Sequence, residues 1–548
     1  MKKFPFLLFL IFLSIFPLLS IWRTGIYQSG DMGTHVMFLI SFYHSLQQGI
    51  FFPRWSAEFC AGFGYPHMQF FYQLPYYIAS LFHFVGFGFI DSIKLLMCVS
   101  FLGAAATMFW WLKTEFGERA AFVGALFYAF APYQLIDLHF NVALGESLAF
   151  VFVPLLFLCV KKLGTSSKKV IWFGGFVAIL VALILTHPVA PLISLPFVVA
   201  YSFVLQKKFD LKKTFVIFAA ITFSLLLTCY HWLPILAEGQ LIQQSQLQVV
   251  SFPQWWEFFF APWKFGFLFQ GHHGEVSPLI GYAQLILFAI GVAMNFRSKL
   301  KKNDRLLLRF FLISVVLLFL FMQSFTKSFW LTTPILNNFQ TSRRLVFMII
   351  ILNAGIAAIV TKNLRTTKFT KYFLITICTF AYLSTILNWG SRAMIRDVTD
   401  HIVTLQIPTR CDRVALPIWV KQTEVATMGL SRFQDLEVLQ GAANFVELPR
   451  TFIRHEYVVN AKTDATFKEN TTYFPSWVLF VNGKRQKIDY QNPSAPGIIT
   501  ILLKPGLYSL TLEYRETPIE AVAKWVSLTT LGLTFLSPLI IHFHPDLV

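Results

Sequence analysis

The chain has 548 residues, of which 56% are hydrophobic and only 13% carry a charged side chain. With a mean hydropathy of +0.61, this composition excludes an ordinary soluble protein and is typical of a polytopic membrane protein. The formal net charge of +18 does not indicate a nucleic-acid partner, because the basic residues cluster between hydrophobic runs, as in the cytoplasmic loops of membrane proteins.

About twelve hydrophobic runs come close to the roughly 20 apolar residues that a membrane span needs. We interpret the first run as an uncleaved span, because no convincing small-residue cleavage site follows it. The predicted spans cover about 4–22, 92–112, 119–136, 144–160, 170–186, 189–205, 214–236, 278–296, 306–325, 343–361, 371–389 and 520–541.

Alternate loops between these spans are basic, and the positive-inside rule assigns them to the cytoplasm. This alternation predicts that both termini are cytoplasmic. Three long segments then lie outside: a first loop at 23–91, an aromatic loop at 237–277 and a polar segment at 390–518. The domain organisation that we predict is a transmembrane domain at 1–389, the outer segment at 390–518, and a final span with a cytoplasmic tail at 519–548.

The outer segment is the only part that resembles a soluble domain. Asn482-Gly483 joins two strand-like runs and predicts a tight hairpin. Hydrophobic and polar residues alternate strictly over 505–515, which predicts a half-buried strand. We therefore expect a small β-sandwich before the last span. A packing or spacer module without chemistry is the alternative interpretation of this domain.

The first outer loop begins with "YQSGDMGTHV", which contains Asp31 and His35. Ionisable residues at a membrane edge indicate function by default, and positions i and i+4 share one helix face. Ser29 and Gly30 form a plausible N-cap region. The alternative is that Asp31 only caps the helix that begins there.

A second outer turn, "APYQLIDLHFNVALGESLAF", carries Asp137, His139 and Glu146. Carboxylates beside histidines serve as general bases or hold a divalent cation. The spacing matches no zinc motif. A Mg or Mn ion held by Asp31, His35 and Glu146 is therefore one hypothesis for this edge, and metal-free chemistry is the other.

Three arginines complete the candidate set. Arg54 lies in the aromatic stretch 49–82, which we expect to form interfacial helices on the outer leaflet. Arg343 and Arg344 stand at the outer end of a span, against the sidedness rule, and guanidinium groups bind phosphate well. Snorkelling to lipid headgroups is the alternative for this pair.

The six cysteines form no CxxC pair and no pattern typical of a disulfide framework. Most lie inside hydrophobic runs. Cys60 and Cys411 do not, and we expect both to be exposed.

Three stretches resemble one family. Residues 30–77, "GDMGTHVMFLISFYHSLQQGIFFPRWSAEFCAGFGYPHMQFFYQLPYY", resemble the first outer loop of the 6-pyruvoyl-tetrahydropterin synthase-related membrane proteins, which are related to YfhO-type proteins. "NNFQTSRRLVFM" resembles that family's "QFPWRFL" element, with Thr341-Ser342 in place of Pro-Trp. "YFPSWVLFVNGK" and "PGLYSLTLEYRETP" resemble its C-terminal segment. No cluster of three histidines supports pterin chemistry.

The family is similar to the GT-C glycosyltransferase superfamily. That resemblance implies an integral-membrane enzyme that transfers a hexosyl or pentosyl group from a polyprenyl-phosphate sugar to a cell-envelope glycan or glycolipid. It implies Asp31 as the base, Glu146 or Asp137 as the second acidic group, and Arg343 or Arg344 as the donor-phosphate ligand. His35, Arg54 and His139 are further substrate-binding candidates. A lipid or polysaccharide transporter and a non-catalytic envelope assembly protein are the alternative functions.

Overall fold

The computed structural model describes residues 5–206, 209–246, 250–261, 277–296, 300–333, 336, 339–390, 394–421 and 434–543. The chain forms two compact units, each assembled from three stretches of sequence. Unit 1 comprises Met1–His35, Tyr77–Leu225 and Gln248–Thr399, and unit 2 comprises Val36–Tyr76, Leu226–Leu247 and Asp400–Val548.

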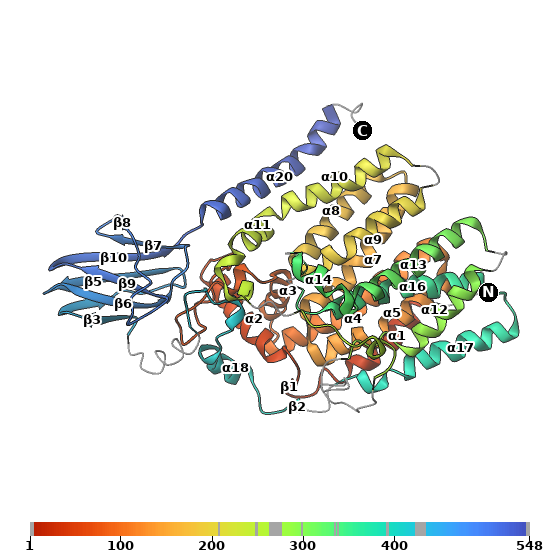
Figure 1. Cartoon of the computed structure of the whole chain (residues 1–548), viewed down its shortest axis with the longest axis horizontal. Coiled ribbons are helices and arrows are strands. Elements are labelled where there is room, and N and C mark those ends of the chain that lie inside the picture. Colours follow the sequence, from red (N-terminus) through yellow and green to blue (C-terminus); the bar gives the residue numbers. More distant parts are fainter. Residues whose placement is uncertain are drawn as a thin grey trace. The chain divides into compact units, whose positions relative to one another are not determined.

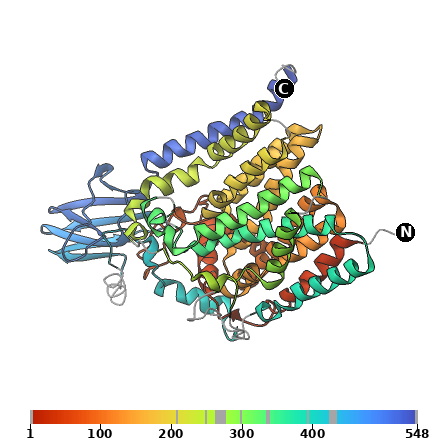
Figure 2. The ribbon, with the colours of Figure 1, turned by 45° about the vertical axis from the view of Figure 1, so that its right-hand side comes forward.

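Unit 1 is built from helices that lie side by side in both views (Figure 1 and Figure 2). A short ladder joins β1 (Ile26–Tyr27) to β2 (Met394–Ile395) in antiparallel register. Its helices are α1 (Phe6–Leu18), α4 (Phe89–Phe116), α5 (Glu118–Ala129), α6 (Pro132–Ile136), α7 (Leu144–Thr165), α8 (Lys169–Thr186), α9 (Val189–Leu205), α10 (Leu211–Leu227), α12 (Tyr282–Asn295), α13 (Lys302–Phe321), α14 (Lys327–Thr332), α16 (Val346–Asn363) and α17 (Lys368–Leu383).

Helix α16 forms the centre of unit 1. It is apolar on every side, and 94% of its most hydrophobic 18-residue stretch is buried. Such burial is expected for a helix that other helices enclose. A glycine lets α5 approach it closely: a Cβ on Gly124 would lie 2.7 Å from the carbonyl oxygen of Ala354. Small residues at such contacts are typical of helix packing in membranes.

The number of helices that could span a membrane depends on how bent and short helices are assigned. Among the described residues, five are long and apolar enough by themselves, and the number rises to eight if each of three bent helix pairs forms one span. Three shorter apolar helices, α1, α9 and α12, also coincide with predicted spans. The count of about twelve therefore stays a prediction, although a helix lies at each predicted position.

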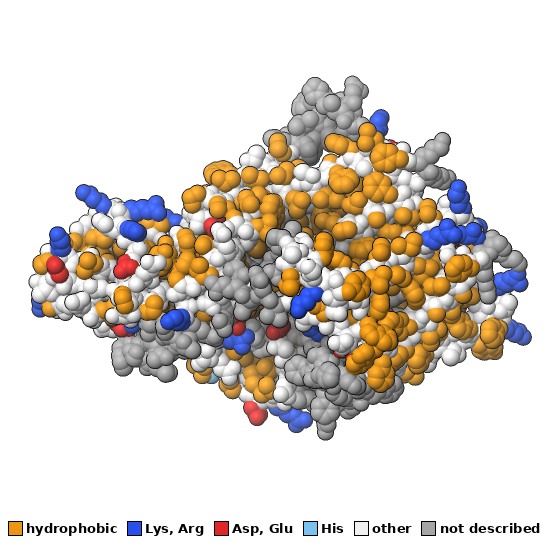
Figure 3. All heavy atoms as spheres, viewed as in Figure 1, with side chains coloured by type: hydrophobic (Ala, Val, Ile, Leu, Met, Phe, Trp, Pro, Cys, Tyr) orange, Lys and Arg blue, Asp and Glu red, His pale blue; other side chains and the backbone are white. Residues whose placement is uncertain are grey.

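Hydrophobic side chains cover much of the visible face of these helices (Figure 3). As one example, helix α13 exposes five large hydrophobic side chains: Leu306, Ile313, Val316, Leu317 and Leu320. A contiguous apolar surface of this kind is suited to lipid rather than water. Lys and Arg gather at one end of the helices in the same view.

The C-terminal part of unit 2 is rich in β-strands, as predicted. One sheet has the order β4-β5-β10-β7-β8 and the other the order β3-β6-β9. Buried side chains from both sheets, including Val459, Phe467, Leu479 and Leu510, form one hydrophobic core. The strands are β3 (Leu436–Gln440), β4 (Ala443–Glu447), β5 (Arg454–Ala461), β6 (Ala465–Thr472), β7 (Trp477–Val481), β8 (Lys484–Gln486), β9 (Ile498–Leu503) and β10 (Gly506–Tyr514).

The local predictions for this region are confirmed. β7 and β8 form an antiparallel hairpin, and Asn482 and Gly483 turn it with positive φ angles of 49° and 75°. The predicted strand at 505–515 is β10, which buries Leu510 and Leu512. The helices of unit 2 include α11 (Cys229–Glu238), α18 (Asp400–Gln406) and α20 (Pro518–Phe543).

The expectation of interfacial helices over 49–82 is mostly wrong. Helix α3 (Leu74–Phe84) covers its end, and a single 3-10 turn covers His67–Gln69. The rest of the stretch is irregular, because its prolines and glycines interrupt helical hydrogen bonding. Part of the predicted aromatic outer loop, 262–276, lies outside the described residues.

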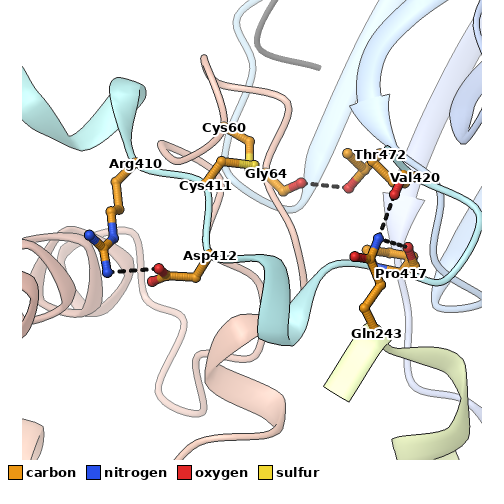
Figure 4. The surroundings of a disulfide bond; sticks show 9 residues. All are labelled: Cys60, Gly64, Gln243, Arg410, Cys411, Asp412, Pro417, Val420 and Thr472. Atoms are coloured by element: carbon orange, nitrogen blue, oxygen red, sulfur yellow. Dashed lines mark hydrogen bonds and ion pairs between the residues drawn. A yellow bond between two sulfur atoms is a disulfide. The ribbon is translucent and has the colours of Figure 1, made fainter. Parts of the chain in front are cut away.

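A disulfide joins Cys60 to Cys411 in unit 2 (Figure 4). The expectations of no disulfide and of two exposed cysteines are therefore wrong, and Cys60 is only 2% exposed. Backbone contacts hold the two segments together beside the bond: the Cys60 amide donates to the Arg410 carbonyl and the Ala61 amide to the Pro408 carbonyl. The two cysteines are 351 residues apart, so no local sequence pattern predicts that they pair.

Breaking this disulfide is expected to destabilise unit 2. The variant Cys411→Ser should lower the free energy of unfolding by about 2–4 kcal/mol, the usual contribution of a native disulfide. Thermal unfolding of the purified protein measures the loss, with Cys378→Ser as the control because Cys378 has a free thiol. Equal unfolding temperatures for the two variants would show that the bond contributes no stability.

Candidate functional site

The segment that carries Asp31 connects β1 to helix α2 (Met32–Gln47). The Ser29 hydroxyl accepts a hydrogen bond from the Met32 amide at 3.1 Å, so this serine satisfies an amide of the first turn, as N-cap residues do. The Asp31 side chain is exposed. The predicted N-cap region is thus confirmed, and a carboxylate stands open to solvent at the start of α2.

The second acidic turn has an unusual backbone. Residues Asp137–Asn141 form a π-helical turn that ends at Val142 in the left-handed conformation. Such turns are rare and occur frequently at functional sites. The turn follows α6 and precedes α7, whose first turn contains Glu146. The positive end of a helix dipole stabilises a carboxylate in that place.

Backbone hydrogen bonds join the two segments directly. The Gly30 amide donates to the Phe140 carbonyl at 2.8 Å, and the Asp31 amide donates to the Asn141 carbonyl at 3.0 Å. Carbonyls at a helix end lack partners within the helix, and here the loop amides satisfy them. A Cβ on Gly30 would lie 3.2 Å from the Asn141 carbonyl oxygen, so a glycine suits this close approach.

Side-chain contacts extend the link from Asp31 to the acidic residues of the second turn. The Asn141 amide group donates to Asp137 at 2.6 Å, and the Glu146 carboxyl acts electrostatically on Asp137. The Tyr133 hydroxyl donates to Glu146 at 2.8 Å. Asp137 and Glu146 are 2% and 6% exposed, in contrast to Asp31. The structure therefore brings together the segments that carry the three predicted carboxylates, because the Asp31 amide meets the Asn141 carbonyl and the Asn141 side chain binds Asp137.

The two arginines lie beside this network. Arg343 acts electrostatically on Asp137 and on Tyr133. Arg344 contacts His187 at 3.3 Å and donates to the Gln340 side chain at 2.9 Å. Both arginines belong to a 3-10 turn, Ser342–Leu345. The turn is anchored because the buried Ser342 hydroxyl donates to the Met322 carbonyl.

Glu146, His187 and Arg344 also line one narrow recess, together with apolar side chains of α9 and α16. It has no room for a water molecule in this conformation. The recess itself therefore admits no phosphate in this conformation.

The two histidine candidates are buried and pack within unit 1. Burial lowers the pKa of His35 to about 3, against a smaller opposing effect of a hydrogen bond to the Val142 backbone. His35 is therefore neutral at pH 7, and it fixes the start of α2 on the π-helical turn. His139 is 0% exposed and contacts the Tyr27 hydroxyl at 3.4 Å.

Arg54 is the one predicted site residue that belongs to unit 2. Its guanidinium forms an ion pair with Glu520 at 2.5 Å, and the side chains of Arg54 and Glu520 are 12% and 0% exposed. Glu520 also accepts from the Thr517 amide, while the Thr517 hydroxyl accepts from the Glu520 amide. This reciprocal pair is a capping box that starts α20.

The described residues contain no group of three or more His, Cys, Asp and Glu side chains placed to hold a metal ion. The Mg or Mn ion that the sequence raised as a hypothesis, with Asp31, His35 and Glu146 as ligands, remains a prediction to be tested by chelation.

Sequence reasoning missed Tyr133 and gave Asn141 no role. Tyr133 precedes Asp137 by four residues, which places both on one helix face, so the spacing offered a signal. Asn141 gave none, because its role depends on the π-helical turn.

The Tyr133 hydrogen bond should stabilise the buried acidic pair. Tyr133→Phe removes a donor from the buried Glu146 carboxyl, and we expect the free energy of unfolding to fall by about 1–3 kcal/mol. Denaturant titration of the purified protein measures it. Tyr372→Phe, on an exposed tyrosine of α17, is the control. An equally small change in both variants would contradict the assigned hydrogen bond.

Comparison with known proteins gives relatives of limited coverage. An uncharacterized protein of Lactococcus lactis subsp. cremoris (strain MG1363) is 24% identical over 247 residues, which are 43% of this chain and 40% of that protein. This chain thus spans two fifths of the length of that relative.

Among solved structures, the oligosaccharyltransferase of Archaeoglobus fulgidus matches with a TM-score of 0.44 and 12% identity, over 74% of this chain and 56% of that one. The mycobacterial arabinofuranosyltransferase AftD matches with a TM-score of 0.44 and 15% identity, over 70% of this chain and 27% of that one. ArnT from Cupriavidus metallidurans matches with a TM-score of 0.30 and 12% identity, over 65% and 76%.

The family comparison covers more than half of the chain. A family model described as "6-pyruvoyl-tetrahydropterin synthase related domain; membrane protein" matches residues 68–392. The matched range includes the π-helical turn, Glu146 and both arginines of the candidate site. The chain therefore belongs to the 6-pyruvoyl-tetrahydropterin synthase-related family of membrane proteins.

Proposed function

We propose that this protein is an integral-membrane glycosyltransferase that uses a polyprenyl-phosphate sugar as donor and a hydroxyl of a cell-envelope glycan or glycolipid as acceptor. The observation that carries the proposal is the set of hydrogen bonds that holds the segment of the exposed Asp31 against the turn of the buried Asp137, on which Glu146 and Arg343 act electrostatically. The similarity of the family to the GT-C glycosyltransferases, which the first outer loop carries, supports this reaction type.

The proposed chemistry needs one exposed base and one site of positive charge. Asp31 takes the proton from the acceptor hydroxyl, whose oxygen then forms a bond to the anomeric carbon of the sugar. The bond from that carbon to the phosphate oxygen breaks, and the electron pair leaves with the polyprenyl phosphate. The centre passes through oxocarbenium character, as in other glycosyl transfers.

Arg343 and Arg344 stabilise the phosphate leaving group in this scheme, because guanidinium groups pair with phosphate oxygens through charged hydrogen bonds. Asp137 and Glu146 are both buried. In this scheme they are the second acidic groups of the site, and their hydrogen bonds hold the turn that positions Asp31. No step is assigned to a metal ion.

We also propose that the protein is a multi-pass component of the cell membrane with both termini in the cytoplasm and the β-domain outside. Two observations support this orientation. Disulfides form and persist in oxidising compartments, and the Cys60–Cys411 bond lies in unit 2, which contains the strands. The basic loops alternate along the chain in the manner of the positive-inside rule.

An assay of the purified protein in vesicles tests the function. A panel of polyprenyl-phosphate hexoses and pentoses is supplied with envelope glycolipid acceptors, with and without EDTA, and released polyprenyl phosphate is measured. We expect release with one donor class that depends on the acceptor. Transbilayer movement of the donor without release would instead favour a transporter. Neither release nor movement with any donor would favour the assembly role.

A further inference from the structure

Away from the candidate site, unit 1 has an apolar groove of about 590 Å³ between α1, α5 and α17. Its walls are almost wholly hydrophobic. The lining residues are Phe6, Phe9, Leu13, Arg119, Phe122, Val123, Leu126, Lys371, Leu374, Ile375, Cys378, Thr379 and Tyr382.

The groove has a direction. One end of the groove is formed by the first turns of the three helices, which contain Phe6, Arg119 and Lys371. The other end is formed near the C-termini of α5 and α17, at Leu126 and Tyr382. At about 1.5 Å per residue, the stretch of α17 from Lys371 to Tyr382 is about 16 Å long. Half of a bilayer's hydrocarbon core is about 15 Å thick. The groove thus has the length of one leaflet.

Both cations of the groove lie at the same end. A side-chain nitrogen of Arg119 is buried and has no hydrogen-bond partner within the described part of the chain. Lys371 is exposed one turn into α17. The N-termini of α5 and α17 add positive partial charge there. An anion at this end would therefore be attracted, and the Arg119 nitrogen would gain a partner.

We propose that this groove binds one anionic glycerophospholipid, with an acyl chain between α1, α5 and α17 and its phosphate on Arg119 and Lys371. The charged end lies at the opposite end of α5 from the π-helical turn, so the lipid occupies the leaflet opposite the candidate site. By the predicted loop orientation this is the cytoplasmic leaflet, whose anionic lipids attract basic residues. The inference is independent of the glycosyltransferase proposal.

Lipid retention by the full-length protein tests the proposal. The protein is reconstituted in vesicles of equal phosphatidylglycerol and phosphatidylcholine, extracted in mild detergent, and the lipids that remain bound are quantified by mass spectrometry. We expect about one phosphatidylglycerol per chain. The double variant Arg119→Gln, Lys371→Gln should lower the ratio of phosphatidylglycerol to phosphatidylcholine by about tenfold, because each cation contributes to anionic-lipid attraction.

Two further variants separate the groove from general surface charge. Lys168→Gln with Lys169→Gln removes two exposed cations at the start of α8 and should leave the ratio unchanged. Thr379→Trp fills the groove while keeping both cations, and it should also abolish phosphatidylglycerol retention. Equal ratios in all variants would show that bulk lipid fills the groove, and retention by Thr379→Trp would show binding to the cations alone. Either result overturns the proposal.

Discussion

Replacing Asp31 by asparagine is expected to lower the rate of glycosyl transfer by about 10²–10⁴-fold, the usual contribution of a general base. Asparagine keeps the shape of the side chain but cannot accept the acceptor's proton. The start of α2 keeps its Ser29 cap and the bond of the Asp31 amide to Asn141 in this variant, and its unfolding temperature is measured beside the wild type. Initial rates of donor turnover, measured with the sugar that the wild type accepts, give the result.

A matched carboxylate provides the control for this variant. Asp91 is half exposed, lies in the first turn of α4 and pairs only weakly with Lys94 at 3.5 Å. Asp91→Asn should therefore leave turnover unchanged. If Asp31→Asn keeps wild-type turnover and unfolds at the same temperature, Asp31 is not the base, and the proposed mechanism fails even though a glycosyltransferase activity could remain.

The variant Arg54→Ala is expected to lower the free energy of unfolding by about 3–5 kcal/mol. Removing one partner of a buried ion pair leaves the other charge without compensation, and Glu520 is fully buried. Glu238 lies in the same cluster, where its carboxylate accepts hydrogen bonds from Gln69 and Thr517. Without Arg54 these two acidic groups would lose the cation that the structure places beside them. Denaturant unfolding of the purified protein measures the loss.

Arg515→Ala is the control for this prediction, because Arg515 pairs with Glu513 while 55% exposed. A surface pair of this kind contributes about 0–1 kcal/mol. If Arg54→Ala is no less stable than Arg515→Ala and instead loses turnover, then Arg54 binds substrate, as the sequence had predicted, and the ion pair is not its main role.

The features that the sequence predicted well depend on neighbouring residues. The hairpin at Asn482-Gly483 follows from two residues that tolerate positive φ, and β10 follows from alternation over nine residues. The helices follow from local hydropathy, although their ends do not: bends such as the 49° break between α5 and the π-helical segment divide runs that look continuous. Hydropathy measures apolar content and is insensitive to such breaks.

The features that the sequence did not reveal depend on contacts between distant segments. Asp31 and Glu146 were both predicted as site residues because ionisable residues at a membrane edge indicate function. The hydrogen bonds that join their segments involve backbone atoms, so no residue type in the sequence predicts them. Arg54 looked like a substrate ligand because its partner Glu520 is 466 positions later (520 minus 54). The roles of the site residues remain predictions.

The bond between Cys60 and Cys411 has a consequence for biogenesis. Because one sulfur belongs to an early stretch and the other to a late one, the ribosome must finish most of the polypeptide before the two can meet. Oxidation of this pair therefore marks chains whose synthesis has passed residue 411. In a pulse-labelled culture, protection of Cys60 and Cys411 from thiol alkylation, with the four free thiols as internal reference, would report newly made molecules that have closed this bond.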